Sequence, residues 1–205
     1  MKELKNVTLI CADCIDPQRA INVLYLCQEE FKFARTILFT DEHMKVVDAD
    51  IDVISIPRIK CIEEYSHFMM FNLVKYIKTS HVLIVQWDGF IINPQAWNDE
   101  FLNYDYIGAP WWYSKNNVGN GGFSLRSLKL LWATSCENFK QYHPEDDAIC
   151  RTHHDFLESN YDIKYAPESV AKKFSYEPNI KYPDSDLSSF GFHGIELIHH
   201  ALCRK

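Results

Sequence analysis

One carboxylate, Asp88, follows directly on a strongly apolar run at residues 81–86. A side chain at the end of a buried strand faces the crevice beyond the sheet. Hard oxygen ligands of this kind bind Mg²⁺ or Mn²⁺ together with waters and substrate phosphates. Asp88 is therefore a candidate to bridge a metal ion to a diphosphate. The alternative is a turn, because Asp88 precedes Gly89 and Asp-Gly is a common turn pair.

A short glycine-rich run, Gly119-Asn120-Gly121-Gly122, is the second candidate. Glycine allows the backbone to approach a ligand closely or to adopt a positive φ. Polar Ser124 and Arg126 follow the run. The simpler explanation is a tight loop between two elements, and a glycine cluster alone is a weak signal.

Three acidic residues, Glu145, Asp146 and Asp147, follow Pro144. Acidic side chains at a helix start are favoured by the helix dipole, which explains at least one of them. A carboxylate in a cleft could also take a proton from an acceptor hydroxyl. If the segment is helical, Glu145 and Asp146 point about 100° apart, so only one of them can face the acceptor.

His193 lies between glycines and aromatic residues near the end of the chain. A lone histidine is more often structural, but it can complete a metal shell with an aspartate and phosphate oxygens. Cys11 and Cys14 have the spacing of a redox motif. The matching proline-bearing strand is missing, and no second cysteine pair completes a zinc site, so we interpret them as reduced thiols near the crevice.

The elements that must position these residues follow an α/β order. Strands are predicted at residues 7–11, 35–40, 51–56 and 81–86, and helices from Asp16-Pro17 onward and at residues 63–78. This order predicts a mostly parallel sheet with helices outside. Ligands bind beyond the carboxyl ends of such strands, so residues 11–13, 40–41, 86–88 and 119–122 are expected to line one crevice.

Composition narrows the class of protein further. A chain of 205 residues with 47% hydrophobic residues can bury the core of one domain. The net charge of −7 argues against a nucleic-acid binder, which needs a basic face. The chain shows no signal peptide and no apolar stretch of membrane-spanning length, so we expect a cytoplasmic, non-spanning protein.

Taken together, these features resemble GT-A type glycosyltransferases. More specifically, they resemble an uncharacterised, mainly bacterial domain family that is grouped with these enzymes. The resemblance covers about residues 60–195, and residues 1–59 match only as a generic nucleotide-binding βαβ start. The matching runs are residues 81–90, 104–111, 118–127, 145–146, 174–177 and 190–194.

The resemblance implies an α/β, GT-A (Rossmann-like) nucleotide-sugar-binding fold, with a mostly parallel central sheet and helices on both faces. Residues 1–205 would form one domain, with a nucleotide-binding half at 1–115 and an acceptor-binding, metal-completing half at 116–205. The implied reaction moves a sugar from a nucleotide-diphosphate sugar to a hydroxyl of a glycan or glycolipid, with Mn²⁺ or Mg²⁺. The implied setting is surface polysaccharide or lipopolysaccharide assembly, in the cytoplasm or at the inner face of the membrane.

The resemblance also implies roles for individual residues. Asp88 and His193 would hold the metal, and Asp146, with Glu145 as the alternative, would be the catalytic base. Gln86 stands where the family's Asp-x-Asp has its first aspartate, which makes the metal site weaker or absent. His67 stands where related transferases have a basic contact to the nucleotide. The full set of implied donor-binding residues is Cys11, Ala12, Thr40, Asp41, Tyr65, His67, Gln86, Trp87, Asn120, Gly121 and Gly122.

Two other functions remain open on the sequence alone. The first is a non-catalytic GT-A-like module that binds a glycan or a partner protein, which Gln86 and the short chain favour. The second is a nucleotidyltransferase, but residues 11–17 lack the glycine-rich basic signature of that class. The nucleotide base, the sugar, the acceptor, the stereochemistry and the oligomeric state are not specified by these patterns.

Overall fold

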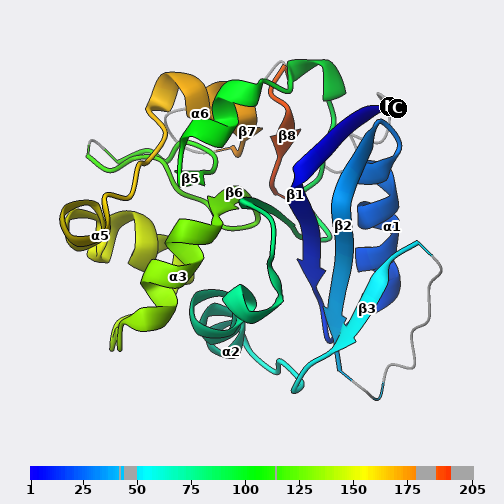
Figure 1. Ribbon diagram of the computed structural model, residues 1–205, viewed down its shortest axis with the longest axis horizontal. Helices are drawn as coiled ribbons and strands as arrows, with labels where there is room; N and C mark the ends of the chain where they lie inside the picture. Colours follow the sequence, from blue (N-terminus) through cyan, green and yellow to red (C-terminus); the bar gives the residue numbers. More distant parts are fainter. Residues whose placement is uncertain (42, 44–49, 114, 179–187, 195–205) are drawn as a thin grey trace.

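Apolar, β-branched runs form the central sheet of the computed structural model, which describes residues 1–41, 43, 50–113, 115–178 and 188–194 (Figure 1). In this part of the chain the sheet has six strands in the order β3-β2-β1-β4-β6-β5. The strands are β1 (Lys2–Ala12), β2 (Phe31–Thr40), β3 (Asp52–Ser55), β4 (His81–Val85), β5 (Tyr106–Ile107) and β6 (Phe123–Ser127). Neighbours among β3, β2, β1 and β4 are parallel, whereas β6 is antiparallel to β4 and β5. The expected mostly parallel sheet is confirmed.

Helices cover both faces of the sheet, as expected. Leu9 and Leu38 pack with the apolar face of α1 (Pro17–Gln28), while Ile10 and Ile37 pack with α2 (Ile62–His67) and α3 (Leu128–Cys136). A strand covered on both faces has no polar side, and for that reason every residue of β4 is buried. Helix α1 begins as predicted, because Asp16 caps it and Pro17 stands in its first turn.

The single helix predicted at residues 63–78 is wrong. The chain instead forms α2, then a π-helical turn η2 (Phe68–Asn72), then a 3₁₀ turn η3 (Leu73–Tyr76). Phe68, Met69 and Met70 are consecutive and all buried, but Phe68 and Met69 pack under the sheet whereas Met70 packs in a separate cluster beside α3. The single apolar stripe of an α-helix cannot pack into two clusters at once. The wider π-helical turn η2 lets Met70 pack in a different cluster from Phe68 and Met69.

The second half of the chain adds short elements around β5 and β6. They are η4 (Pro94–Ala96), η5 (Asp99–Asn103), α4 (Glu145–Asp147), η6 (Ala148–Thr152), α5 (His154–Tyr161), α6 (Glu168–Phe174), β7 (Ser175–Tyr176) and β8 (Gly191–Phe192). β7 and β8 pair in parallel beside the sheet (Figure 1). Phe123, Phe174 and Phe190 join the same buried cluster as Leu9 and Leu38, so the described parts of both halves share a core.

Residues 195–205, which end the predicted acceptor half, lie outside the described residues. Among the helices that are described, none combines the length and the apolar character needed to cross a bilayer.

Candidate functional site

A cavity of about 320 Å³ lies at the carboxyl ends of β1 and β4. Five of the predicted donor-binding residues line it: Cys11, Ala12, Tyr65, Gln86 and Trp87. Its other lining residues are Asp13, Cys14, Ile15, Arg19, Ile59, Lys60, Cys61 and Ile62. The cavity therefore lies where the carboxyl ends of adjacent parallel strands place a ligand.

Charged groups in this cavity favour an anionic ligand. Arg19 and Lys60 line it, and the Arg19 guanidinium lies 4.6 Å from the centroid of the Trp87 ring. The one carboxylate, that of Asp13, already accepts hydrogen bonds from the backbone N–H groups of Ile15 and Asp16 over 2.7 and 2.8 Å. Arg19 also forms a 2.8 Å ion pair with Asp16, but both cations can still donate hydrogen bonds to a phosphate group.

His193 joins the end of β4 to the glycine-rich run and to β7. Its Nε2 lies 3.2 Å from Gln86 Oε1 and 3.4 Å from Asp88 Oδ1. Its Nδ1 lies 3.0 Å from Glu177 Oε1 and 3.2 Å from Asn120 Nδ2. The two predicted metal ligands, Asp88 and His193, are thus brought together, although 105 positions separate them in the chain (193 − 88).

The carboxylates beside His193 control its charge. Burial favours the neutral ring, but hydrogen bonds and charges from Asp88 and Glu177 together outweigh burial and raise the pKa of His193 to about 9. The ring is therefore protonated at neutral pH, with each nitrogen facing an acceptor.

This raised pKa predicts a stability that depends on pH. An unfolded histidine has a pKa of about 6.5, so the stabilisation is fully present below that pH and is lost as the pH rises through about 9. Between pH 7 and pH 10, the wild type should lose on the order of 2 kcal/mol of unfolding free energy that a His193→Gln variant does not lose. Urea unfolding of both proteins at the two pH values measures this difference, and equal losses would contradict it.

The Asp88 carboxylate has unused bonding capacity. Its Oδ1 is buried, and among the described residues its one polar contact is the 3.4 Å ion pair with His193 Nε2. Adjacent ligands around an octahedral Mg²⁺ lie about 3 Å apart, with each ligand about 2.1 Å from the ion. His193 Nε2 lies at similar distances from Gln86 Oε1 and Asp88 Oδ1, so these donors fit a divalent cation once the Nε2 proton has left. Binding of a metal by these residues stays a prediction.

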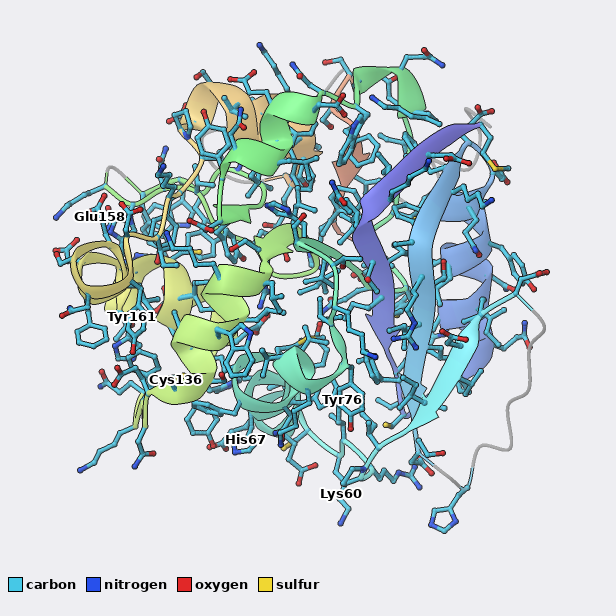
Figure 2. The ribbon with its side chains drawn as sticks, in the orientation of Figure 1. Lys60, His67, Tyr76, Cys136, Glu158 and Tyr161 are labelled. Atoms are coloured by element: carbon cyan, nitrogen blue, oxygen red, sulfur yellow. The ribbon has the colours of Figure 1, made fainter. Side chains whose placement is uncertain are left out.

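Glu177 cannot join such a metal shell, because it faces the opposite ring nitrogen of His193. It can orient the ring so that Nε2 faces Asp88 and Gln86. A separate group of metal-type side chains, His154, Asp155 and Glu158, lies on α5, away from this cluster (Figure 2). Its two carboxylates are exposed, and exposed acidic groups are common without an ion.

The glycines at 121 and 122 are needed for contact with protein side chains. A Cβ on Gly122 would lie 2.1 Å from the His193 ring, and a Cβ on Gly121 would lie 2.4 Å from Glu145 Oε1. The positive φ of the run, 62°, belongs to Asn120, whose Oδ1 accepts a hydrogen bond from the Gly122 N–H. The run therefore packs the site residues closely, and it does not line the 320 Å³ cavity.

The two candidate bases have different surroundings in α4. Glu145 is buried and accepts a 2.9 Å hydrogen bond from Nη2 of Arg126, which is fully buried. Burial raises the pKa of Glu145, and the charge of Arg126 opposes that rise. Asp146 is half-buried and accepts a 2.9 Å hydrogen bond from the Gly121 N–H. Asp146 is thus the more available carboxylate, and it lies beside the glycine-rich run that reaches His193.

Six predicted donor-binding residues do not line this cavity: Asn120, Gly121 and Gly122 of the glycine-rich run, and Thr40, Asp41 and His67. Thr40 and Asp41 are buried at the end of β2, and Asp41 faces Arg58 at 3.9 Å. Residues 40–41 were expected in the crevice, but neither lines this cavity. His67 lines a different cavity, described below.

The cysteines near the cavity are free thiols. Cys11 and Cys14 are both buried, and burial raises the pKa of each thiol. A thiol with a raised pKa is a poor nucleophile, which agrees with their interpretation as reduced, inert side chains.

Sequence reasoning gave no role to several residues of the site. Glu177 and Arg126 stand inside runs that carried the resemblance, but nothing in their spacing pointed to His193 or Glu145 as a partner. Arg19 and Lys60 are ordinary surface cations in the sequence. They become candidate ligand-binding residues only because α1 and the segment after β3 both line the cavity.

Comparisons with known proteins concern the family and the fold of the chain. A family model described as "Protein of unknown function (DUF5672)" matches residues 48–193, and no curated protein sequence matches the chain. The chain is similar in structure to a glycosyltransferase involved in the glycosylation of the major capsid of PBCV-1. That match has a TM-score of 0.55 and 14% identity, and it covers 96% of this chain and 98% of the other. This likeness shows a glycosyltransferase-like α/β fold.

Two structures of the glycosyltransferase GlyE from Streptococcus pneumoniae TIGR4 also match. The apo form has a TM-score of 0.48 at 9% identity and covers 94% of this chain and 54% of that chain. The other GlyE structure has a TM-score of 0.46 at 12% identity and covers 78% of this chain and 44% of that chain.

Proposed function

The chain belongs to the DUF5672 family, and we propose that it is a glycosyltransferase that moves a sugar from a nucleotide-diphosphate sugar to a hydroxyl of an acceptor glycan or glycolipid. One observation carries the proposal. A cavity lined by two cations, Arg19 and Lys60, meets the Asp88–His193 pair at Gln86, which both lines the cavity and contacts His193. The proposed setting is surface polysaccharide or lipopolysaccharide assembly in the cytoplasm, as the sequence resemblance implies.

The 320 Å³ cavity is the proposed site of the nucleotide. Its volume lies in the range of about 300–1,000 Å³ that is usual for small-molecule sites. Trp87 offers an aromatic surface to a ring, and Arg19 and Lys60 offer positive charge to the diphosphate. Tyr65 holds Gln86 in place by accepting a 3.1 Å hydrogen bond from Gln86 Nε2.

Asp88 and His193, with the amide oxygen of Gln86, are the residues that would hold Mn²⁺ or Mg²⁺. A bound divalent ion offsets the charge that develops on the leaving diphosphate. Glu177 fixes the orientation of His193 through Nδ1. Because Gln86 is neutral, Asp88 is the one carboxylate of this donor set.

Asp146 is the proposed general base for an inverting reaction. It would take the proton from the acceptor hydroxyl as that oxygen bonds to the anomeric carbon of the donor sugar. The bond from the anomeric carbon to the diphosphate oxygen breaks, and the diphosphate leaves with the electron pair. The Gly121 N–H holds one carboxylate oxygen of Asp146 in position.

Thermal unfolding with a panel of nucleotide sugars, with and without Mn²⁺, tests the proposal. A donor present at a hundred times its dissociation constant should add about 2.7 kcal/mol of stability. One nucleotide sugar should raise the unfolding temperature, and its free sugar should not. A panel that leaves the unfolding temperature unchanged would contradict the proposal.

Asp88→Asn tests the metal part separately. The variant should lose the share of nucleotide-sugar stabilisation that depends on Mn²⁺, because an amide lacks the charge that binds the ion. Asp99→Asn is the matched control, since Asp99 is an exposed carboxylate outside the site. If the Mn²⁺ dependence is unchanged in Asp88→Asn, the ion is bound elsewhere.

One alternative has a specific observation in its favour. Gln86 stands where related glycosyltransferases have the first aspartate of Asp-x-Asp. A neutral side chain at this position fits a non-catalytic module that binds a glycan or a partner protein. Such a module would bind glycan without nucleotide sugar, so the thermal unfolding panel separates the two functions.

A further inference from the structure

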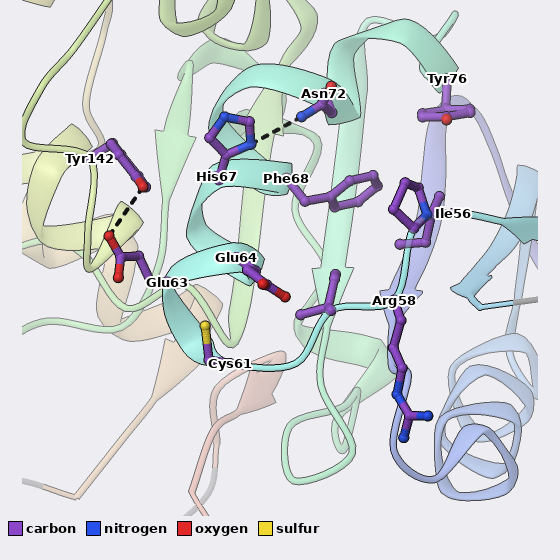
Figure 3. Close-up of a pocket in the computed structure, with 12 residues that line it drawn as sticks. Ile56, Arg58, Cys61, Glu63, Glu64, His67, Phe68, Asn72, Tyr76 and Tyr142 are labelled. Carbon is purple, nitrogen blue, oxygen red and sulfur yellow. Dashed lines mark hydrogen bonds between the residues drawn. The ribbon is translucent and has the colours of Figure 1, made fainter.

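Figure 3 shows a second cavity, whose volume is about 570 Å³. The two cavities share Ile59 and Cys61, so the segment between β3 and α2 forms a common wall. The second cavity extends along α2 and η3 toward Tyr142. None of the reaction steps described above uses it.

Aromatic side chains supply much of its wall. Phe68 and Tyr76 lie on one side, with His67 and Tyr142 on the other (Figure 3). The Tyr76 ring is held by an edge contact to Phe39 at 5.0 Å and by a tilted contact to Phe68 at 6.3 Å. Its hydroxyl has no hydrogen-bond partner among the described residues. Fixed rings next to an open hydroxyl suit a ligand with apolar faces and polar edges.

The polar side chains of the cavity have bonding capacity to spare. Glu63 Oε1 accepts a hydrogen bond from the Tyr142 hydroxyl, and Glu64 Oε2 accepts one from the Lys60 N–H. Each carboxylate therefore keeps one oxygen available, and Arg58 makes only a 3.9 Å ion pair with Asp41. Two carboxylates against one guanidinium disfavour phosphates and other anions. The same groups can accept from, and donate to, neutral hydroxyls.

We propose that this cavity binds a neutral carbohydrate chain. The C–H faces of a sugar ring would pack on Tyr76 and Tyr142, and its hydroxyls would donate to Glu63 and Glu64. The cavity is large enough for more than one sugar unit, whereas the donor cavity is smaller. If the proposed function holds, the bound carbohydrate is the outer part of the acceptor glycan. Only this identification rests on the proposed function.

Helix α2 connects the two cavities to the candidate base. It contributes Glu63, Glu64 and His67 to the larger cavity, and Ile62 and Tyr65 to the smaller one. On its buried side, the Ser66 hydroxyl lies 2.9 Å from His143 Nδ1 and 3.5 Å from Glu145 Oε2. Tyr142 stands four positions before Asp146. A glycan in the larger cavity would therefore contact the same helix and loop that support the acidic pair.

Nuclear magnetic resonance of the ¹⁵N-labelled chain tests the inference. The probes are the neutral trisaccharides maltotriose, mannotriose and triacetylchitotriose, with trigalacturonate as the anionic counterpart and UDP as a probe of the donor cavity. At least one neutral trisaccharide should shift the amide signals of Arg58, His67 and Asn72, and trigalacturonate should not.

Two variants locate the binding. Tyr142→Ala should weaken trisaccharide binding about tenfold, because it removes a stacking surface. Tyr161→Ala is the matched control: Tyr161 is also a half-buried tyrosine that donates to a glutamate, Glu137, but it lies on α5 (Figure 2). Tyr76→Phe keeps the ring packing and removes only the unpaired hydroxyl, so it tests the cavity even if Tyr142→Ala fails to fold. It should weaken binding several-fold.

The outcomes separate this inference from the proposed function. Absence of shifts with every neutral trisaccharide, or shifts confined to Ala12 and Trp87, would overturn the inference while leaving the donor cavity untouched. If UDP shifts no signal but a trisaccharide still shifts the amides of the larger cavity, the carbohydrate site stands and the donor-based function fails.

Discussion

We expect the Asp146→Asn protein to bind nucleotide sugar as tightly as the wild type but to transfer the sugar about 10²–10⁴-fold more slowly. The loss follows from the proton, because an amide cannot accept one from the acceptor hydroxyl. The asparagine oxygen can still accept the hydrogen bond that Gly121 donates to Asp146, and the variant loses only the one that the Asp147 N–H donates to Oδ1, so the fold should survive. Turnover with a saturating donor measures the effect, and the thermal shift with the same donor shows that binding is retained.

Asp147→Asn is the control for this change. Asp147 is the next carboxylate in α4, and its contacts to Arg151 and Thr152 lie at the surface. It should keep near-normal turnover. If Asp146→Asn also keeps near-normal turnover, Asp146 only supports the glycine-rich run, or the enzyme retains configuration and needs no base at this position.

The fold was largely predictable because buried parallel strands appear in a sequence as continuous apolar runs. After His81, every residue of the run that forms β4 is apolar, so the run does not resemble a surface element. Helix α1 was equally clear, since Asp16 and Pro17 together signal a helix start. The break after His67 was not predictable, because its cause is the packing of Met70 into a different cluster from Phe68 and Met69.

The candidate site was predictable only in part. Spacing cannot pair Asp88 with His193, and the family resemblance supplied that pair. It could not supply Glu177, which meets His193 only because β7 and β8 lie side by side. Thr40 and Asp41 were expected at the cavity because all parallel strands end at one edge, but both are buried and do not line it.

The glycines in the run at residues 119–122 were recognised as positions of close backbone approach, but the approaching group was not identified from the sequence. The sequence indicated close approach of the backbone to another group. The groups that approach are the His193 ring and the Glu145 carboxylate, which belong to the protein. Sequence alone cannot distinguish a ligand from a distant side chain as the partner of a glycine.

The Arg126→Met variant should lose about 3–5 kcal/mol of unfolding free energy, because it leaves the Glu145 carboxylate buried without its cation. Arg126 is fully buried, and it also donates from Nε to Ser124 Oγ over 3.2 Å. Glu145 in turn packs against Gly121, so the loss should also disturb the backbone that holds Asp146. Urea unfolding at pH 7 measures the change.

Two further proteins show whether the buried ion pair is the cause. Arg35→Met breaks the ion pair of 2.8 Å to Asp52, but that pair is solvent-exposed and should contribute at most about 1 kcal/mol. The double variant Arg126→Met/Glu145→Met removes both buried charges and should recover most of the stability lost in the single variant. A double variant no more stable than Arg126→Met would show that the packing of the guanidinium, and not its charge, supports the fold around Asp146.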